Sequence, residues 1–168
     1  MKAVIPFVLL ALVALSGCSF GIVNLPNEQH DNSDPAKMET WLASPAFQLE
    51  AVNENNEKVI TTAFGEKEHL AVIPGSILAG VNAKMMWLFW GEADQLVGKK
   101  VKFMAVSQTG ERMEFGGAYE DSLSGENWGA PASILAYPNF PSSGLWKIEV
   151  TVDDKPFGEV VLEVKEEA

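Results

Sequence analysis

The sequence contains little cysteine and histidine, with one cysteine and two histidines among 168 residues. A single cysteine excludes an internal disulfide and leaves a cysteine-based zinc site without enough ligands. Basic residues are also few, since 12 lysines and arginines stand against 23 aspartates and glutamates, for a net charge of −11. A nucleic-acid partner is therefore not expected, because binding to phosphates needs a basic face.

Long helical patterns are missing as well. No window of about 12 residues carries the apolar stripe of a helix, which argues against alternating strands and helices. Short apolar runs instead alternate with turn residues at intervals near ten residues, which is typical of an antiparallel β-sandwich or barrel. The predicted strands cover residues 47–51, 58–62, 70–73, 84–90, 101–106, 146–152 and 159–164.

The final hairpin gives the clearest fold signal. The stretch Asp153-Asp154-Lys155-Pro156 forms a polar turn between two runs in which apolar and polar residues alternate. Such alternation predicts strands with one buried and one solvated face. The predicted inward rows are Ile148, Val150 and Val152 on the first strand and Val160, Leu162 and Val164 on the second.

The N-terminus indicates export. After Lys2, an apolar run covers residues 3–15 and is broken only by Pro6. As a helix this run would span about 20 Å, short of the ~30 Å hydrocarbon core, so it is typical of a signal peptide. The sequence Leu15-Ser16-Gly17-Cys18 resembles the lipobox of bacterial lipoproteins. That resemblance implies cleavage between Gly17 and Cys18, with a diacylglycerol on Cys18.

Three segments are therefore expected. Residues 1–17 are the signal peptide, residues 18–40 a lipidated tether rich in proline, glycine and asparagine, and residues 41–168 the β-sandwich. The expected location is the extracytoplasmic face of the cell membrane. The membrane is then a partner through the lipid on Cys18, since acyl chains give stable anchoring.

Two family resemblances refine this interpretation. The stretch Pro141-Ser142-Ser143-Gly144-Leu145-Trp146-Lys147-Ile148 resembles the start of the final hairpin in bacterial immunoglobulin-like domains. The order of the segments 41–47, 74–80, 84–91 and 144–148 is similar to that in small lipoproteins of spore-forming Gram-positive bacteria, a family without an assigned function. Together they imply an all-β, immunoglobulin-like antiparallel sandwich, and they transfer no catalytic residue.

Catalytic and metal-binding patterns are weak. No Gly-x-Ser-x-Gly motif is present, and a serine–histidine–acid site would have to use His69. An enzyme and a cofactor are therefore not expected. A further alternative to a binding module is protease inhibition through a sandwich loop. The main alternative is copper handling by His69 with a methionine, because thioethers suit copper(I). The candidate methionines are Met85, Met86, Met104 and Met113.

Aromatic residues suggest where a binding surface lies. In the run 84–90, Trp87 and Phe89 should point to one face, while Met86, Leu88 and Trp90 point to the other. The second row needs either a covering loop, such as the segment 116–140, or a partner. The leading interpretation is a non-enzymatic binding or accessory module of the cell envelope. Its candidate surface residues are Trp90, Tyr119, Trp128 and Tyr137.

Overall fold

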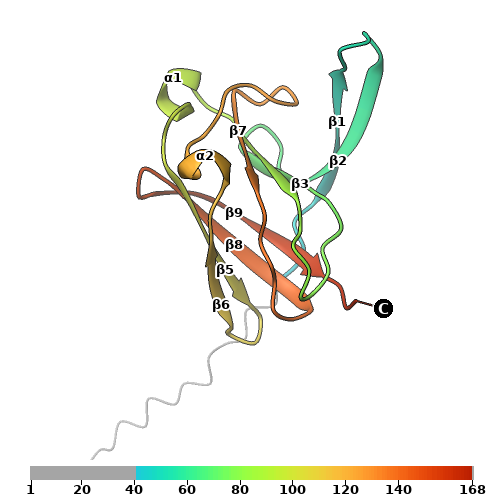
Figure 1. Ribbon diagram of the computed structural model, residues 1–168, viewed down its shortest axis with the longest axis vertical. Helices are drawn as coiled ribbons and strands as arrows, with labels where there is room; N and C mark the ends of the chain where they lie inside the picture. The colour runs from blue at the N-terminus through green and yellow to red at the C-terminus, as the bar shows by residue number, and fades with distance from the viewer. Residues whose placement is uncertain (1–40, 168) are drawn as a thin grey trace, which may run out of the picture. The chain divides into compact units, whose positions relative to one another are not determined.

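Two antiparallel β-sheets pack face to face in the computed structural model, which describes residues 41–167 (Figure 1). The first sheet has the strand order β1-β2-β3-β4-β7, and the second has the order β6-β5-β8-β9. The strands are β1 (Ala46–Val52), β2 (Lys58–Glu66), β3 (Leu70–Pro74), β4 (Met85–Phe89), β5 (Val101–Ser107), β6 (Arg112–Phe115), β7 (Ala132–Ala136), β8 (Gly144–Val152) and β9 (Lys155–Val164). Two short helical turns are α1 (Ala93–Leu96) and α2 (Ala118–Asp121).

The predicted all-β sandwich is confirmed, and each of the seven predicted strands is present. The immunoglobulin-like type of the sandwich stays a prediction. The leader and tether predicted over residues 1–40 lie outside the described residues.

Two strands were not predicted from the sequence. β6 has only four residues, and two of them, Arg112 and Glu114, are charged. β7 lies within the segment 116–140, which was expected to be a loop. Its sequence, Ala-Ser-Ile-Leu-Ala, contains a single β-branched residue and so carries little strand propensity. Pairing with β4 along its whole length makes it a strand.

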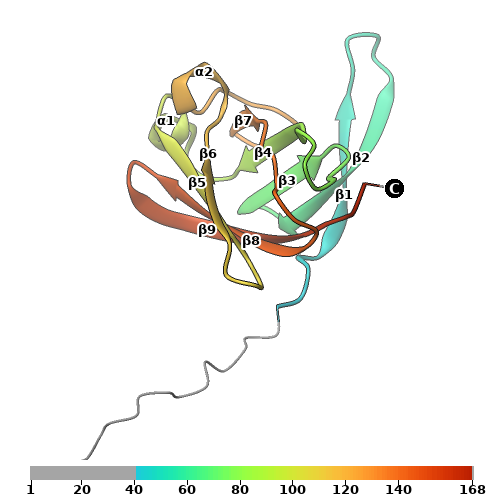
Figure 2. The same cartoon turned by 60° about the horizontal axis from the view of Figure 1, so that its bottom comes forward.

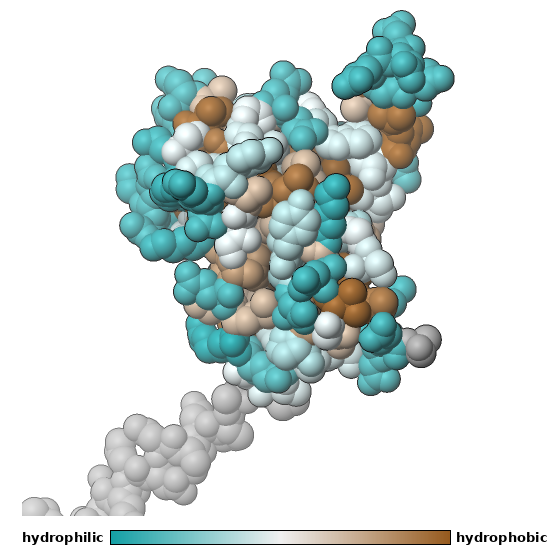
Figure 3. All heavy atoms as spheres, viewed as in Figure 1, coloured by the Kyte–Doolittle hydropathy of each residue, from teal (hydrophilic) through white to brown (hydrophobic). Residues whose placement is uncertain are grey.

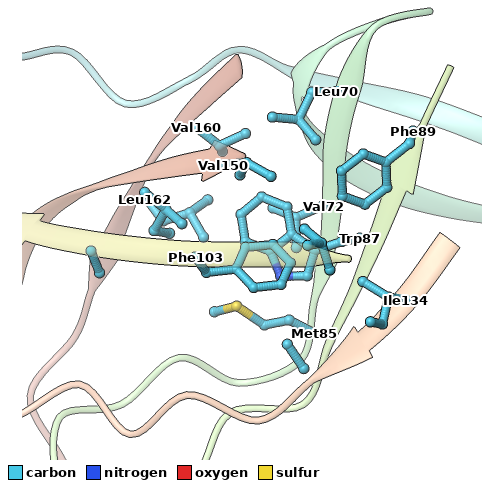
Figure 4. Packing of buried hydrophobic residues seen from close by; sticks show 14 of the residues in the cluster. Leu70, Val72, Met85, Trp87, Phe89, Phe103, Ile134, Val150, Val160 and Leu162 are labelled. Atoms are coloured by element: carbon cyan, nitrogen blue, oxygen red, sulfur yellow. The ribbon is translucent and has the colours of Figure 1, made fainter. Parts of the chain in front are cut away.

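Aromatic side chains connect the two sheets inside the sandwich. Trp87 on β4 lies against Phe103 on β5, with ring centroids 4.8 Å apart, and Phe103 stacks on Phe115 of β6 at 4.9 Å. All four residues Trp87, Phe103, Phe140 and Trp146 are fully buried. Figure 4 shows Trp87 and Phe103 packed between Met85, Val72 and Ile134 from the first sheet and Val150 and Leu162 from the second. Burial of such large rings, together with the aliphatic residues around them, drives the packing of one sheet on the other.

The β8–β9 hairpin is present as predicted, but its turn is shorter than expected, because Lys155 and Pro156 already pair with β8. The two turn residues, Asp153 and Asp154, have positive φ angles of 47° and 60°, as a two-residue type I′ turn requires. The Asp153 carboxylate accepts hydrogen bonds from Lys99 Nζ at 3.0 Å and from the Lys100 backbone N–H at 3.1 Å. These bonds lower the pKa of Asp153 below its usual value, the Lys99 contact contributing most. The predicted inward rows of both strands lie in the core.

The β1–β2 hairpin projects beyond the rest of the sandwich (Figure 2). β2 pairs with β3 only from Phe64 to Glu66, whereas it pairs with β1 along the whole of β1. The outer half of the hairpin therefore lacks a second sheet on its inner face. Val52 and Ile60 on that face remain 65% and 55% exposed.

Gly65 is essential where the pairing of β2 with β1 ends and its pairing with β3 begins. Its φ is +132°, and an added Cβ would lie 2.4 Å from the Leu70 carbonyl oxygen and 2.9 Å from the Ala71 Cα. Because both are backbone atoms, neither can move without disrupting the β2–β3 pairing. Gly65→Ala should lower the free energy of unfolding by about 3 kcal/mol, measured by urea denaturation with tryptophan fluorescence.

The matched control for this prediction is Gly125→Ala. An added Cβ at Gly125 meets no atom within 4 Å, and its φ is not in the left-handed region. This variant should change the free energy of unfolding by no more than about 0.5 kcal/mol. Equal stability of the two variants would contradict the assigned role of Gly65.

Candidate functional site

Strand β4 is apolar on both faces, and both faces are covered. Met85, Trp87 and Phe89 point into the sandwich and have no exposed surface. Leu88, on the opposite face of the sheet, is also fully buried, and Met86 and Trp90 on that face are partly buried. The first sheet therefore supports a second apolar layer on its outer side.

We call this layer the outer cluster. It draws on strands β1 to β4 and on the loop before β7, and its partly exposed members surround a buried centre. The buried members are Leu49, Ala63, Ala71, Leu88 and Ala130, and the partly exposed ones are Phe47, Ile73, Met86, Trp90 and Trp128.

The loop formed by residues 124–131 covers part of the outer cluster. Ser124 and Ser133 exchange backbone hydrogen bonds of 2.8 and 3.1 Å, which ties the start of the loop to β7. Asn127 and Ala130 exchange two more, of 3.0 and 2.9 Å, and the Asn127 side-chain amide donates to the Met86 sulfur at 3.6 Å. The expectation that part of the segment 116–140 covers the outward row of β4 is thus confirmed.

The four predicted surface residues fall into two groups. Trp90 and Trp128 pack against the outer cluster, one from the end of β4 and one from the covering loop. Tyr119 on α2 and Tyr137 after β7 lie outside that cluster and are 72% and 52% exposed. The structure therefore unites the two tryptophans in one apolar layer and does not place the two tyrosines in it.

Sequence analysis missed the contribution of β1 to this layer. Phe47 and Leu49 belong to the outer cluster, whereas the alternate residues of β1 are all exposed. The alternation of the strand was visible in the sequence, but it cannot tell which side of a sheet becomes the core. Here the apolar row of β1 faces away from the second sheet.

A groove lies between the β1–β2 hairpin and the covering loop, with a cavity volume of about 540 Å³. Ala51, Val52 and Val59 from the hairpin and Trp128 from the loop provide its apolar surface. Glu50 and Glu126 also line it, and no lysine or arginine does. Figure 3 shows hydrophobic side chains at the base of the projecting hairpin, below a hydrophilic tip. The groove can receive an apolar segment and favours one that also carries positive charge.

A second opening of about 400 Å³ lies between the sheets beside β9. Phe64, Ile77, Leu78 and Leu162 give it apolar walls, and Lys165 lies at its side. It opens where β9 faces β2 and β3, and none of the four predicted surface residues lines it.

His69 has a structural role at the start of β3. Its Nε2–H donates to the Phe157 carbonyl oxygen at 2.9 Å, and its ring stacks on the Phe157 ring with centroids 4.9 Å apart. The methionines considered with it are dispersed, because Met85 is inside the core and Met86 lies in the outer cluster. Within residues 41–167, no three His, Cys, Asp or Glu side chains gather as a metal site would require.

The structure bears on the membrane anchor only in part. Cys18 and the proposed cleavage site after Gly17 lie outside the described residues. Between residues 41 and 167, no helix is long and apolar enough to cross a membrane.

The fold is similar to that of a solved structure. A crystal structure described as that of "a Putative Lipoprotein from Bacillus anthracis" is similar, with a TM-score of 0.51 and 20% sequence identity. The match covers 86% of this chain and 99% of the other, and at this identity it establishes the shared fold alone. None of the curated proteins compared with the chain matches it.

Residues 33–162 match the family model "Domain of unknown function (DUF4871)". This match covers every strand of the sandwich except the last two residues of β9. The chain therefore belongs to the DUF4871 family.

Proposed function

We propose that this protein is a lipid-anchored binding module on the extracytoplasmic face of a bacterial membrane. The partly exposed outer cluster and its groove carry this proposal, since a sandwich needs only one apolar face per sheet to fold. An additional apolar layer with partly exposed tryptophans is typical of a surface that binds a partner. The fold shared with a Bacillus anthracis protein described as a lipoprotein supports the location.

The binding partner that fits the groove is a protein segment with apolar side chains and flanking basic residues. Trp128 and Val59 provide the apolar contact, and the acidic lining adds attraction for lysine or arginine. The net charge of −11 favours the same partners over acidic ones. We propose no catalytic role, since the hydrogen bond and ring stacking of His69 account for that residue structurally.

Loss of the cysteine should remove the anchor. In cells supplied with a labelled fatty acid, Cys18→Ala should abolish incorporation of the label into this protein and release it from the membrane fraction. The physical reason is that only the Cys18 thiol can accept the diacylglycerol. Ser19→Ala, at the neighbouring position, is the control and should retain both label and membrane association. Equal labelling of the Cys18→Ala and wild-type chains would refute the anchor.

The groove can be tested with a photo-crosslinking amino acid in place of Val59, in cells of the native organism. A crosslinked adduct with an envelope protein is expected from Val59, which lines the groove, and none from Glu149, which is exposed on the second sheet. High salt during irradiation should weaken the adduct, because the groove lining is acidic.

Trp128 should decide the strength of this contact. Trp128→Ala removes one wall of the groove, so the adduct from position 59 should fall by about tenfold. Tyr137→Ala removes an exposed aromatic residue outside the groove and should leave the adduct unchanged. Adducts of equal yield at positions 59 and 149, or insensitivity to Trp128→Ala, would contradict a binding role for the groove.

A further inference from the structure

The free edge of β1 presents an uninterrupted row of backbone hydrogen-bonding groups. Hydrogen bonds from the Gly65 N–H to the Pro45 carbonyl and from the Asn53 N–H to the Glu57 carbonyl, 3.1 and 3.0 Å long, fix the pattern of the β1–β2 ladder. With the regular register between them, every second residue of β1 bonds to β2. The backbone N–H and C=O groups that point away from β2 are those of Ala46, Gln48, Glu50 and Val52.

Within residues 41–167, none of these outward groups has a backbone partner. The side chains of the same four residues are all exposed. β1 contains no proline, and its pairing with β2 shows no bulge. Proline and bulges are two features that normally protect a sheet edge from pairing with another chain, and β1 has neither; Glu50 is its one charged residue.

The other sheet edges are protected. At β7, Ser124 bonds to Ser133 and Gly117 forms a bridge with Ala136. At β9, Ser44 bonds to both backbone groups of Val161, and further along the edge the Lys165 N–H donates to the Ile77 carbonyl. β6 is only four residues long and carries two charged side chains.

The hairpin has one more free stretch, along the β3 side of β2. That stretch ends near Thr62, because β2 pairs with β3 from Phe64 onward. Among the strands between residues 41 and 167, only β1 is therefore open along its whole length.

We propose that β1 pairs with β1 of a second copy of this chain, antiparallel and with a two-fold axis at Leu49. Pairing of this kind would join two five-stranded sheets into one continuous sheet. In this register Leu49 lies opposite Leu49 of the second copy, and Gln48 lies opposite Glu50. Phe47 then faces Ala51, and Ala46 faces Val52.

The side chains of β1 are complementary to themselves in this register. On the outer face, Phe47 and Leu49 extend the outer cluster of one copy into that of the other. On the inner face, the Gln48 amide meets the Glu50 carboxylate, so no two like charges lie opposite each other. Moving the axis to Glu50 would place two carboxylates together, and moving it to Gln48 would leave Val52 beyond the paired strand. An unrelated strand would gain the backbone bonds without this matching of side chains.

The first test traps the dimer with a disulfide. It uses residues 18–168 with Cys18→Ala, so that an introduced cysteine is the only thiol in the chain. Leu49→Cys places two thiols at a non-hydrogen-bonded pair, where Cα atoms are about 4.5 Å apart, within the range that a disulfide spans. Mild oxidation should give a covalent dimer.

Thr61→Cys is the matched control for the trap. Thr61 lies directly across from Leu49 on β2, on the same face of the hairpin but one strand away from the open edge. Both β1 strands would lie between the two copies of Thr61, which puts them three inter-strand spacings, about 14 Å, apart, so this variant should not form a disulfide. Trapping of both variants at equal rates would indicate random collision and overturn the proposal.

The second test changes the charge at Gln48 without touching the core, because its side chain is exposed. Gln48→Lys places a lysine opposite each Glu50, and Gln48→Glu places a carboxylate there. Across the two symmetric pairs, the dimer Kd from sedimentation velocity should fall about fivefold for the first variant and rise about fivefold for the second. Raising the salt concentration should tighten the wild-type dimer, since each copy carries a net charge of −11.

Thr62→Lys and Thr62→Glu are the controls for this test, because Thr62 lies across from Gln48 on β2 and is also exposed. Both should change the Kd by less than about twofold. The proposal is overturned if the chain stays monomeric up to about 1 mM and the Leu49→Cys variant forms no disulfide-linked dimer. So does a Kd that responds equally to the changes at positions 48 and 62.

Discussion

The double-sided burial of β4 is the constraint on which the rest of this structure depends. β4 lies between β3 and β7, and its inward residues meet the second sheet through the contact of Trp87 with Phe103. Its outward residue Leu88 is equally buried, although no second sheet lies on that side. An antiparallel sheet is stable with one solvated face, so the apolar outer row of β4 must be covered by something other than the sandwich itself. The loop 124–131 provides that cover only in part.

Partial cover explains the form of the candidate site. Trp128 closes one side of the outer cluster and also forms a wall of the groove beside the β1–β2 hairpin. The hairpin provides the other wall because β2 parts from β3 after three paired residues. Gly65 permits the close pairing of β2 with β3 within this short stretch, since its backbone approaches Leu70 too closely for any side chain. The outer edge of β1 has a different origin: β1 is the terminal strand of the sheet, and among residues 41–167 no strand pairs with its other side.

Much of the sandwich could be predicted from alternation alone. The rows of Ile148, Val150 and Val152 and of Val160, Leu162 and Val164 alternate with polar residues, and all six enter the core as expected. β7 could not be found in this way, because alanine, serine and leucine fit a loop or a helix equally well. The segment 116–140, which was expected to be a covering loop, in fact contains a strand, a short turn and the loop that covers the outer cluster.

The candidate site was predicted in part, and the reason for the difference is geometric. Aromatic content identified Trp90 and Trp128, which the fold brings to one apolar layer. It could not separate them from Tyr119 and Tyr137, because residue type does not show which loops fold back over a sheet. Phe47 and Leu49 were recognisable as one face of a strand, yet not as members of the outer layer.

The sequence by itself determined the class of the fold and the inward rows of the long strands, since both follow from local alternation and turn residues. It also contains the leader and the single cysteine on which the proposed anchor rests. Only the tertiary structure decided which face of β1 is covered, where the loop before β7 lies, and that the β1–β2 hairpin projects. These depend on contacts between residues far apart in the chain, such as Met86 with Asn127, and local patterns do not determine such contacts.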